Sequence, residues 1–154
     1  FSIGAFADDT LAKLEALGLP AGSSVANPID VPAGALQQNE GRVAENIIST
    51  IAASGATDAV VIHVNMTVIM GFRHVDMLGN IIQAALRVRA EHGPGMHIVL
   101  VLRSDGDGET EERKREYRQR ATSNGVAVFD ELAQAARGLA AVRTVETFRL
   151  GGVA

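Results

Sequence analysis

Two polar segments of the sequence carry residue types that could bind an anion or a metal ion. Residues 65–73 follow one apolar run and end in an arginine, and residues 103–108 follow another and read Arg-Ser-Asp-Gly-Asp-Gly. A guanidinium group binds phosphate or carboxylate through two parallel hydrogen bonds. We therefore predict a ligand site in these segments. The candidate residues are Asn65, Arg73, Arg103, Ser104, Asp105 and Gly106.

Both segments also have a plainer interpretation. Arg73 could pair with Asp76, and Arg103 could pair with Asp105 or point into solvent. Asp105 and Asp107 could hold Mg²⁺, although an Asp-x-Asp pattern flanked by glycines is also typical of a turn. At this point the sequence leaves both alternatives open.

The four histidines form no catalytic or metal-binding pattern. His63 lies inside an apolar run, and His97 begins another. His74 is nearest to the first polar segment, but no serine or carboxylate spacing marks it as a base. There is no cysteine and no His-x-x-x-His or His-x-Glu pattern. We therefore predict neither a metal ligand nor a catalytic residue in this chain.

The elements that position the polar segments are predicted to be parallel strands. Residues 59–64 and 97–102 are apolar and rich in β-branched side chains, as is typical of strands covered on both faces. Ligands in open parallel sheets bind beyond the carboxyl ends of the strands. Since the two strands are expected to be neighbours, the two polar segments should lie side by side.

Helices and turns are predicted around these strands. Asp8 or Asp9 should cap the first helix and Asp130 the last. The expected helices cover residues 10–17, 38 or 39 to 54, 77–92, 109–124 and about 132–142, with a short strand at 126–129 and a proline-held extended segment at 25–34. Helix 109–124 is almost wholly charged, and we interpret it as a solvated face.

The order of these elements predicts an α/β fold. We expect a flavodoxin-like, doubly wound parallel sheet with three layers, α/β/α. The 154 residues suit one domain, 1–145, followed by a tail or linker at 146–154. Residues 1–6 should form an edge strand or an extended lead-in. Because the first residue is Phe, we expect a fragment of a longer protein.

Composition excludes several classes of function. The net charge of −4 argues against non-specific binding to nucleic acid or to an anionic membrane. No apolar run approaches the roughly 20 residues of a membrane span, and no signal peptide is evident. Aromatic residues make up 4% of the chain, so the core must be aliphatic. We expect a cytoplasmic protein.

Four segments, in consistent order, match the motifs of a known family. In the first of them, Asn27, Pro28 and Asp30 match an N-P-[VI]-D pattern. The segments are ANPIDV at 26–31, VN at 64–65 with GFRHVD at 71–76, VLVLR at 99–103, and NGVAVF at 124–129 followed by ELA at 131–133. With these segments the chain resembles the NDP-forming acyl-CoA synthetases and the related succinyl-CoA synthetases over about residues 11–141.

The resemblance implies a flavodoxin-like domain of an acid–thiol ligase. Such an enzyme couples cleavage of ATP or GTP to thioester formation between a carboxylic acid and CoA, through a phosphohistidine carried by another domain. The resemblance also implies that Thr67, Met70, Gly71 and Arg73 face the phosphohistidine near a helix N-terminus. CoA, ATP or GTP, and Mg would belong to the parent enzyme, and no cofactor to this fragment.

The sequence departs from the family in two respects. Val68-Ile69-Met70-Gly71 replaces the family's Gly-Gly pair, and the sequence has no phosphohistidine motif, Rossmann CoA-binding domain or ATP-grasp domain. The resemblance also implies that the first βα unit of the fold would lie before Phe1 and is missing from this sequence. We therefore expect no activity from the chain alone, and partners among those domains or subunits in a homo- or hetero-oligomer. The alternative is a non-catalytic regulatory or scaffolding module of the same fold. A receiver-like or flavin-binding domain is a third possibility, disfavoured because no acidic pair precedes Asp30.

Overall fold

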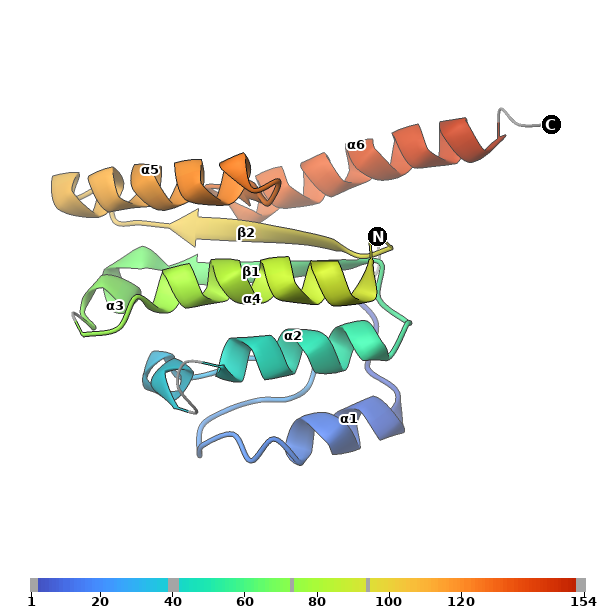
Figure 1. The fold of residues 1–154 in the computed structure, drawn as a ribbon, viewed down its shortest axis with the longest axis horizontal. Helices are drawn as coiled ribbons and strands as arrows, with labels where there is room; N and C mark the ends of the chain where they lie inside the picture. The colour runs from blue at the N-terminus through green and yellow to red at the C-terminus, as the bar shows by residue number, and fades with distance from the viewer. Residues whose placement is uncertain (1–2, 39–41, 73, 94, 152–154) are drawn as a thin grey trace.

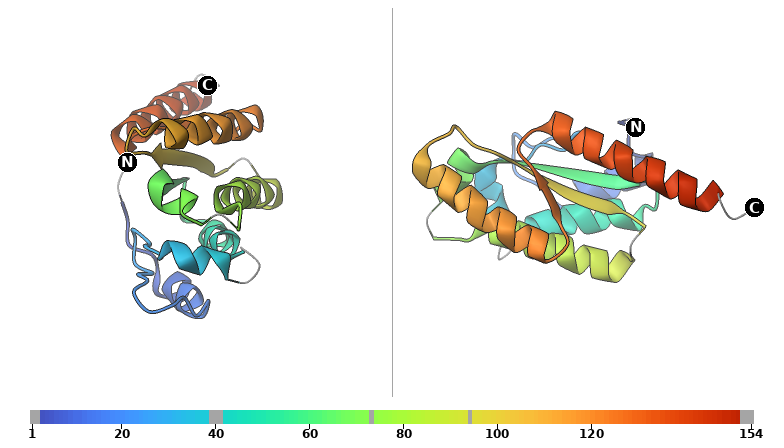
Figure 2. Two further views of the ribbon diagram at one scale, coloured as in Figure 1. Left: turned by 90° about the vertical axis from the view of Figure 1, so that its left-hand side faces the viewer. Right: turned by 90° about the horizontal axis from the view of Figure 1, so that it is seen from above.

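The protein is an α/β structure with a three-stranded parallel sheet and helices on both sides (Figures 1 and 2). The computed structural model describes residues 3–38, 42–72, 74–93 and 95–151, with side chains up to residue 149. The strands are β1 (Ala59–Asn65), β2 (His97–Arg103) and β3 (Ala127–Phe129). The α/β class and the parallel sheet predicted from the apolar runs are confirmed.

Strand β2 is the centre of the sheet. It pairs with β1 over seven residues, from Ala59 opposite His97 to Asn65 opposite Arg103, and with β3 over three residues. Its residues 98–102 are all buried, whereas β1 alternates between partly buried and exposed positions. The continuous burial of β2 explains its unbroken apolar sequence, because both of its faces are covered.

Two helices, α4 (Met77–His92) and α5 (Gly108–Ser123), cover one face of the sheet. There Leu100 and Leu102 of β2 pack with Leu78 of α4 and Ala121 of α5, all of which are fully buried. The opposite face is covered by α6 (Leu132–Gly151), whose Ala135 and Leu139 pack on Val99 and Val101. The layers α/β/α that the sequence predicts therefore surround β2.

Helix α6 approaches the sheet closely at Gly138. A Cβ atom at this position would lie 2.7 Å from Cζ of Phe129, so a larger residue would require the Phe129 ring or the helix to shift. The helix continues without a break past Val145, where we expected the chain to fray. A bond of 2.9 Å between His97 Nε2 and Glu146 Oε1 ties this part of α6 to the start of β2.

The N-terminal part of the chain lies beyond β1, on the side away from β2 (Figure 1). It consists of α1 (Asp8–Glu15), the 3₁₀ helix η1 (Ala33–Gln37) and α2 (Val43–Ala53). Leu14 of α1 packs with Val43, Ile47 and Ile51 of α2 in a separate apolar cluster. Between α1 and η1, the segment that we expected to be extended forms one antiparallel bridge, between Ser24 and Asp30.

Two predictions about where helices begin are wrong. Helix α1 begins at Asp8 after Ala7, without a side-chain cap, so its two aspartates lie in the first turn, where they complement the helix dipole. The second long helix begins at Val43 rather than at residue 38 or 39, and Gln38, the C-cap of η1, has extended backbone (φ −68°, ψ 159°). Residues 3–7 form no strand, so they are the lead-in rather than the edge strand. No helix in the described ranges is long and apolar enough to cross a membrane.

The burial of β2 predicts where the fold is most sensitive to truncation. Leu100→Ala should lower the free energy of unfolding by about 2–5 kcal/mol, since it removes a fully buried side chain from the centre of the sheet. Val61→Ala on β1, where the side chain is 40% exposed, should cost less than about 1 kcal/mol. Urea denaturation followed by circular dichroism measures both values, and equal losses would contradict this account of the core.

Candidate functional site

The two polar segments lie side by side at the carboxyl edge of the sheet. Asn65, the last residue of β1, is the register partner of Arg103, the last residue of β2. Because the strands are parallel and end together, the chain leaves both of them at the same edge. The prediction that the segments are neighbours is therefore confirmed.

The first polar segment contains a short helix. Asn65 accepts a hydrogen bond at 3.4 Å from the backbone N–H of Val68 and so caps α3 (Met66–Met70). The two N–H groups that follow α3 are also hydrogen-bonded. Gly71 donates to Val68 O at 3.2 Å, and Phe72 donates to Ile69 O at 3.1 Å. The backbone that replaces the Gly-Gly pair is thus hydrogen-bonded within its own turn.

The second segment forms a turn and a helix cap. Asp107 caps α5 by accepting from the N–H groups of Glu109 (3.0 Å) and Thr110 (3.3 Å). Asp105 Oδ1 accepts from Asp107 N at 3.1 Å. The hydrogen bond from this N–H lowers the pKa of Asp105, and the Thr67 hydroxyl lowers it further by a smaller amount. Thr67, which belongs to the first segment, therefore also links the two segments. Asp105 and Asp107 therefore form a turn, which was one of the two predicted alternatives. No group of three or more His, Cys, Asp or Glu in the described ranges could hold a metal ion.

Ser104 belongs to a cluster built around a buried lysine. Lys114 of α5 is only 9% exposed, and its Nζ lies 2.8 Å from Glu111 Oε1, 3.2 Å from Ser104 Oγ and 3.2 Å from Asp130 Oδ1. Ser104 also donates to Glu111. Burial alone would lower the pKa of Lys114, but the bonds to Glu111 and Asp130 outweigh it and raise the pKa. Lys114 therefore stays protonated and fastens α5 to the ends of β2 and β3.

This cluster corrects two predictions. The charged helix is not simply a solvated face, since Thr110, Lys114 and Ala121 of α5 are buried. Asp130, expected to cap α6, has its Oδ1 bound by Arg118 Nη2 at 2.6 Å as well as by Lys114. The charged residues of α5 thus lie on more than one side of the helix, and Lys114 and Arg118 attach it to the end of β3 through Asp130.

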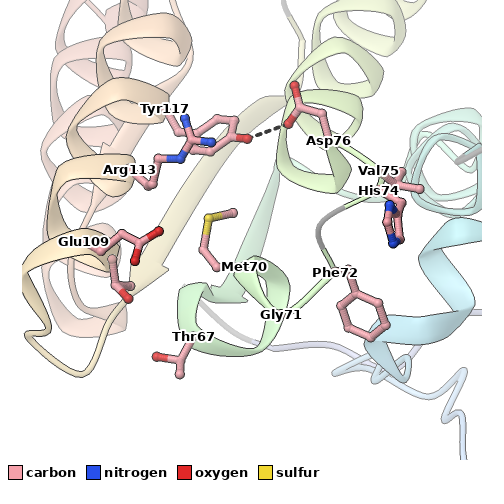
Figure 3. A pocket seen from close by; sticks show the side chains of 11 residues that line it. Thr67, Met70, Gly71, Phe72, His74, Val75, Asp76, Glu109, Arg113 and Tyr117 are labelled. Atoms are coloured by element: carbon pink, nitrogen blue, oxygen red, sulfur yellow. Dashed lines mark hydrogen bonds between the residues drawn. The ribbon is translucent and has the colours of Figure 1, made fainter.

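A cavity of about 610 Å³ lies between α3, the residues after it, and the first turns of α5 (Figure 3). Its lining combines apolar side chains with hydroxyl, imidazole, carboxylate and guanidinium groups. The lining residues are Thr67, Met70, Gly71, Phe72, His74, Val75, Asp76, Glu109, Thr110, Arg113 and Tyr117. It is the candidate functional site of the protein.

Asp76 organises one wall of this cavity. It is the N-cap of α4, where its Oδ1 accepts from Gly79 N at 2.8 Å. The same oxygen accepts from the Tyr117 hydroxyl at 2.6 Å, and Oδ2 accepts from Arg120 Nη1 at 2.9 Å. A methyl group at Gly79 would overlap the Asp76 carboxylate, so a glycine is needed there. One carboxylate thus joins the start of α4 to α5.

Both partners of the Asp76–Tyr117 hydrogen bond have shifted pKa values. Burial opposes the ionised form of Asp76, but hydrogen bonds from Tyr117, Gly79 and Arg120 outweigh it and lower its pKa. Burial, then the hydrogen bond to Asp76, raises the pKa of Tyr117 to about 12. At neutral pH the pair is therefore a carboxylate and a neutral phenol that donates to it.

Only part of the predicted site lines the cavity. Thr67, Met70 and Gly71 do, whereas Arg73 lies outside the described residues. The other candidates of the two segments do not line it: Asn65, Arg103, Ser104, Asp105 and Gly106. Arg103 is exposed and forms no ion pair in the described part of the chain. Asp76, which was considered as a partner of Arg73, forms an ion pair with Arg120.

The family-motif residues near the N-terminus are also outside the cavity. Asn27 Nδ2 donates to Gly4 O at 2.8 Å, which fixes the lead-in segment against the turn that contains Pro28. Asp30 forms the backbone bridge to Ser24. Their observed contacts are with the N-terminal part of the chain, not with the strand ends.

The residues that sequence reasoning missed come in equal numbers from α5 and from the segment before α4. Thr110, Arg113 and Tyr117 follow one another at helical spacing and turn the same side toward the cavity. That spacing, with the only tyrosine of the chain, was the available signal. From the segment before α4, the missed residues are Phe72, His74, Val75 and Asp76, and Glu109 completes the set.

The side chains that line the cavity include several that could bind an anion. The hydrogen bond between lining side chains joins Tyr117 to Asp76, and Asp76 is already held by Arg120. Arg113 is half-exposed, with its Nη1 2.9 Å from Glu116 Oε2, so it can also reach a ligand. With Thr67 and His74 it gives the cavity three side chains that can donate hydrogen bonds to an anion.

No family model matches the chain, and comparison with curated proteins and with solved structures found no significant match.

The role of Asp76 predicts a loss larger than that of a simple helix cap. Asp76→Ala should lower the free energy of unfolding at pH 7 by about 2 kcal/mol, and Asp107→Ala, which removes a cap alone, by about 1 kcal/mol. Because folding lowers the pKa of Asp76, its contribution is present above the ordinary value of 3.8 and is lost as the pH falls through the folded value. Urea denaturation at pH 7 and in acid tests this, and equal losses for the two variants would contradict it.

Tyr117 provides a direct probe of the same contact. In the intact protein its phenol should ionise near pH 12, as followed by absorbance at 295 nm with circular dichroism as a check on folding. In Asp76→Asn the value should fall but stay above 10, because burial still disfavours the phenolate. A folded protein in which Tyr117 titrates at 10 would show that this hydrogen bond does not form.

Proposed function

We propose that this chain is a flavodoxin-like module of an NDP-forming acyl-CoA synthetase. The parent enzyme would be an acid–thiol ligase that couples cleavage of ATP or GTP to acyl-CoA formation through a phosphohistidine carried elsewhere. In this proposal the module does not catalyse by itself. It offers the cavity at the carboxyl edge of the sheet to the phosphorylated group and packs against the other domains or subunits.

One observation carries the proposal. Segments that resemble the family at 64–76 and 99–103 include the ends of β1 and β2, and the register of Asn65 with Arg103 brings them to one edge. The segment at 124–129 contains β3, the next strand of the same sheet. The segments that carry the resemblance thus lie next to one another in the structure as well as in order along the sequence. They belong to a three-stranded sheet that is compatible with flavodoxin-like order.

The way in which the module would contact phosphate differs from that implied by a Gly-Gly loop. The N–H groups of Gly71 and Phe72 are engaged within the turn that follows α3. Phosphate recognition would therefore fall to the side chains of Thr67, His74 and Arg113. A guanidinium group gives strong, charge-assisted hydrogen bonds to phosphate, so Arg113 should contribute most of the affinity.

The same difference supports a second candidate function. A module in which the N–H groups of Gly71 and Phe72 are engaged within their own turn could have kept the fold while losing phosphate handling. It would then serve as a non-catalytic regulatory or scaffolding domain. The two candidates differ in a measurable property, which is phosphate binding in the cavity.

A titration followed by amide resonances would separate them. The probe is a short peptide carrying phosphohistidine, compared with the unphosphorylated peptide and with inorganic phosphate. The module function predicts saturable shifts at Thr67 and Gly71 with the phosphorylated peptide. Arg113→Ala should weaken binding roughly tenfold or more, the effect of one lost hydrogen bond to a charged group.

Arg115→Ala is the matched control, because Arg115 is an exposed arginine on the same helix that does not line the cavity. It should bind the phosphorylated peptide as the unmodified protein does. Equal weakening in both variants, or no shift in the cavity, would contradict the phosphate-facing role and favour the scaffolding module. Thioester formation by the isolated chain with an acid, ATP and CoA would contradict the proposed division of labour.

A further inference from the structure

The charged groups around the cavity do not balance one another. Asp76 is paired with Arg120, whose Nη1 lies 2.9 Å from Oδ2. Arg113 is paired with Glu116, whose Oε2 lies 2.9 Å from Nη1. Glu109 also lines the cavity, and its carboxylate forms no hydrogen bond or ion pair within the described part of the chain. The lining and its direct partners in this part thus contain three carboxylates but only two guanidinium groups.

Glu109 and Arg113 lie one turn apart on the same wall of the cavity. Residues four apart on a helix are neighbours on its surface, with Cβ atoms about 5–6 Å apart. Figure 3 shows both side chains on the α5 side, with Met70 of α3 between them and the opposite wall. His74 lies on that opposite wall, near Phe72, so its imidazole does not face the Glu109 carboxylate.

Arg113 interacts more strongly with Glu116 than with Glu109. The hydrogen bond to Glu116 and the charge of that residue are the main reasons why the pKa of Arg113 is raised, and the charge of Glu109 is a smaller one. The exposed fraction is 54% for the Arg113 side chain and 57% for Glu116. Because exposed ion pairs are weak, Arg113 can exchange Glu116 for an incoming anion. Glu109 would then lie beside that anion.

A phosphate with no positive charge of its own would therefore fit this wall poorly. When bound to Arg113 it would lie about one helical turn from the Glu109 carboxylate. Like charges at such a separation repel each other, and the repulsion grows where protein side chains replace water. A positive charge carried by the ligand would remove this repulsion. It would also give Glu109 a partner.

From this arrangement we propose that the cavity selects a zwitterionic ligand, in which a cationic group lies next to the phosphate. The phosphate binds Arg113, and the cationic group binds Glu109. A linker of about two carbon atoms suits groups that bind one helical turn apart. This inference rests on the phosphate-binding role proposed above and adds the class of ligand to it. Glu109 is thus the residue that determines specificity.

A purely structural role for Glu109 leads to a different expectation. Glu109 lies in the first turn of α5, where a carboxylate complements the helix dipole. Loss of that role would make the protein less stable, but it would leave the preference between two ligands unchanged. A comparison of two ligands on the same variant therefore separates the two roles.

Three small probes test the proposal on the full chain, in buffer free of divalent cations. Aminoethyl phosphate carries both groups, ethyl phosphate lacks the ammonium group, and ethylamine lacks the phosphate. Binding is followed by the amide resonances of Thr67, Glu109 and Arg113. Aminoethyl phosphate should bind about fivefold more tightly than ethyl phosphate, which is the upper range for an ion pair at a protein surface. Ethylamine should bind most weakly of the three.

Two variants with the same substitution locate the partner of the cationic group. In Glu109→Gln the preference for aminoethyl phosphate should fall below about twofold, and ethyl phosphate should bind more tightly than it does to the unmodified protein, because a repulsion is lost. Glu112→Gln removes the same charge from an exposed residue of α5 that does not line the cavity, and it should keep the preference. Arg113→Ala should weaken the binding of both phosphates.

The outcomes separate this inference from the phosphate-binding role. Saturable binding of both phosphates with equal affinity would overturn the zwitterionic ligand and leave the phosphate-binding role intact. Loss of the preference in Glu112→Gln as well as in Glu109→Gln would do the same. Binding of ethylamine as tightly as aminoethyl phosphate would show that the phosphate is not recognised. That result, or the absence of shifts with either phosphate, would overturn both proposals.

Discussion

The parallel register between β1 and β2 is the constraint on which the rest of the structure depends. Seven consecutive pairs hold the two strands so that Asn65 and Arg103 end at the same level. Everything that lines the cavity then enters from these two strand ends, through α3 on one side and α5 on the other. The register is itself stabilised by the complete burial of β2, because a one-residue slip would exchange the faces of its side chains.

Helix α5 is held largely by polar contacts, which is unusual for a helix that covers a sheet. Its buried residues are Thr110, Lys114 and Ala121, a sparse apolar stripe. Lys114 compensates on one side by bonding to Glu111, Ser104 and Asp130, and Tyr117 does so on the other by bonding to Asp76. Because such bonds need a defined geometry, they fix the rotation of α5, and with it the direction of Arg113 into the cavity.

The sequence predicts the elements whose signal is local. The β-branched runs of β1 and β2 mark buried strands, and parallel geometry then requires their following segments to meet. The cavity is harder to predict, because it depends on how α5 docks. Nothing local to Tyr117 tells that this residue faces α4, since its partner Asp76 lies 41 residues earlier. Likewise, α3 is a single turn that forms because Asn65 caps it, a contact too short-range for a periodic pattern to show.

The site and the stability of its frame are therefore coupled through Asp76. In a Gly-Gly loop, backbone N–H groups would make phosphate contacts that hardly depend on a distant helix. Here the N–H groups of Gly71 and Phe72 are used internally, so the phosphate recognition that we propose would depend on side chains from separate elements. Thr67 belongs to α3 and Arg113 to α5, and Asp76 joins the start of α4, just after His74, to α5. A substitution that weakens the packing of α5 would thus alter the cavity without changing a residue that contacts a ligand. The affinity for a ligand would then depend on how α5 docks.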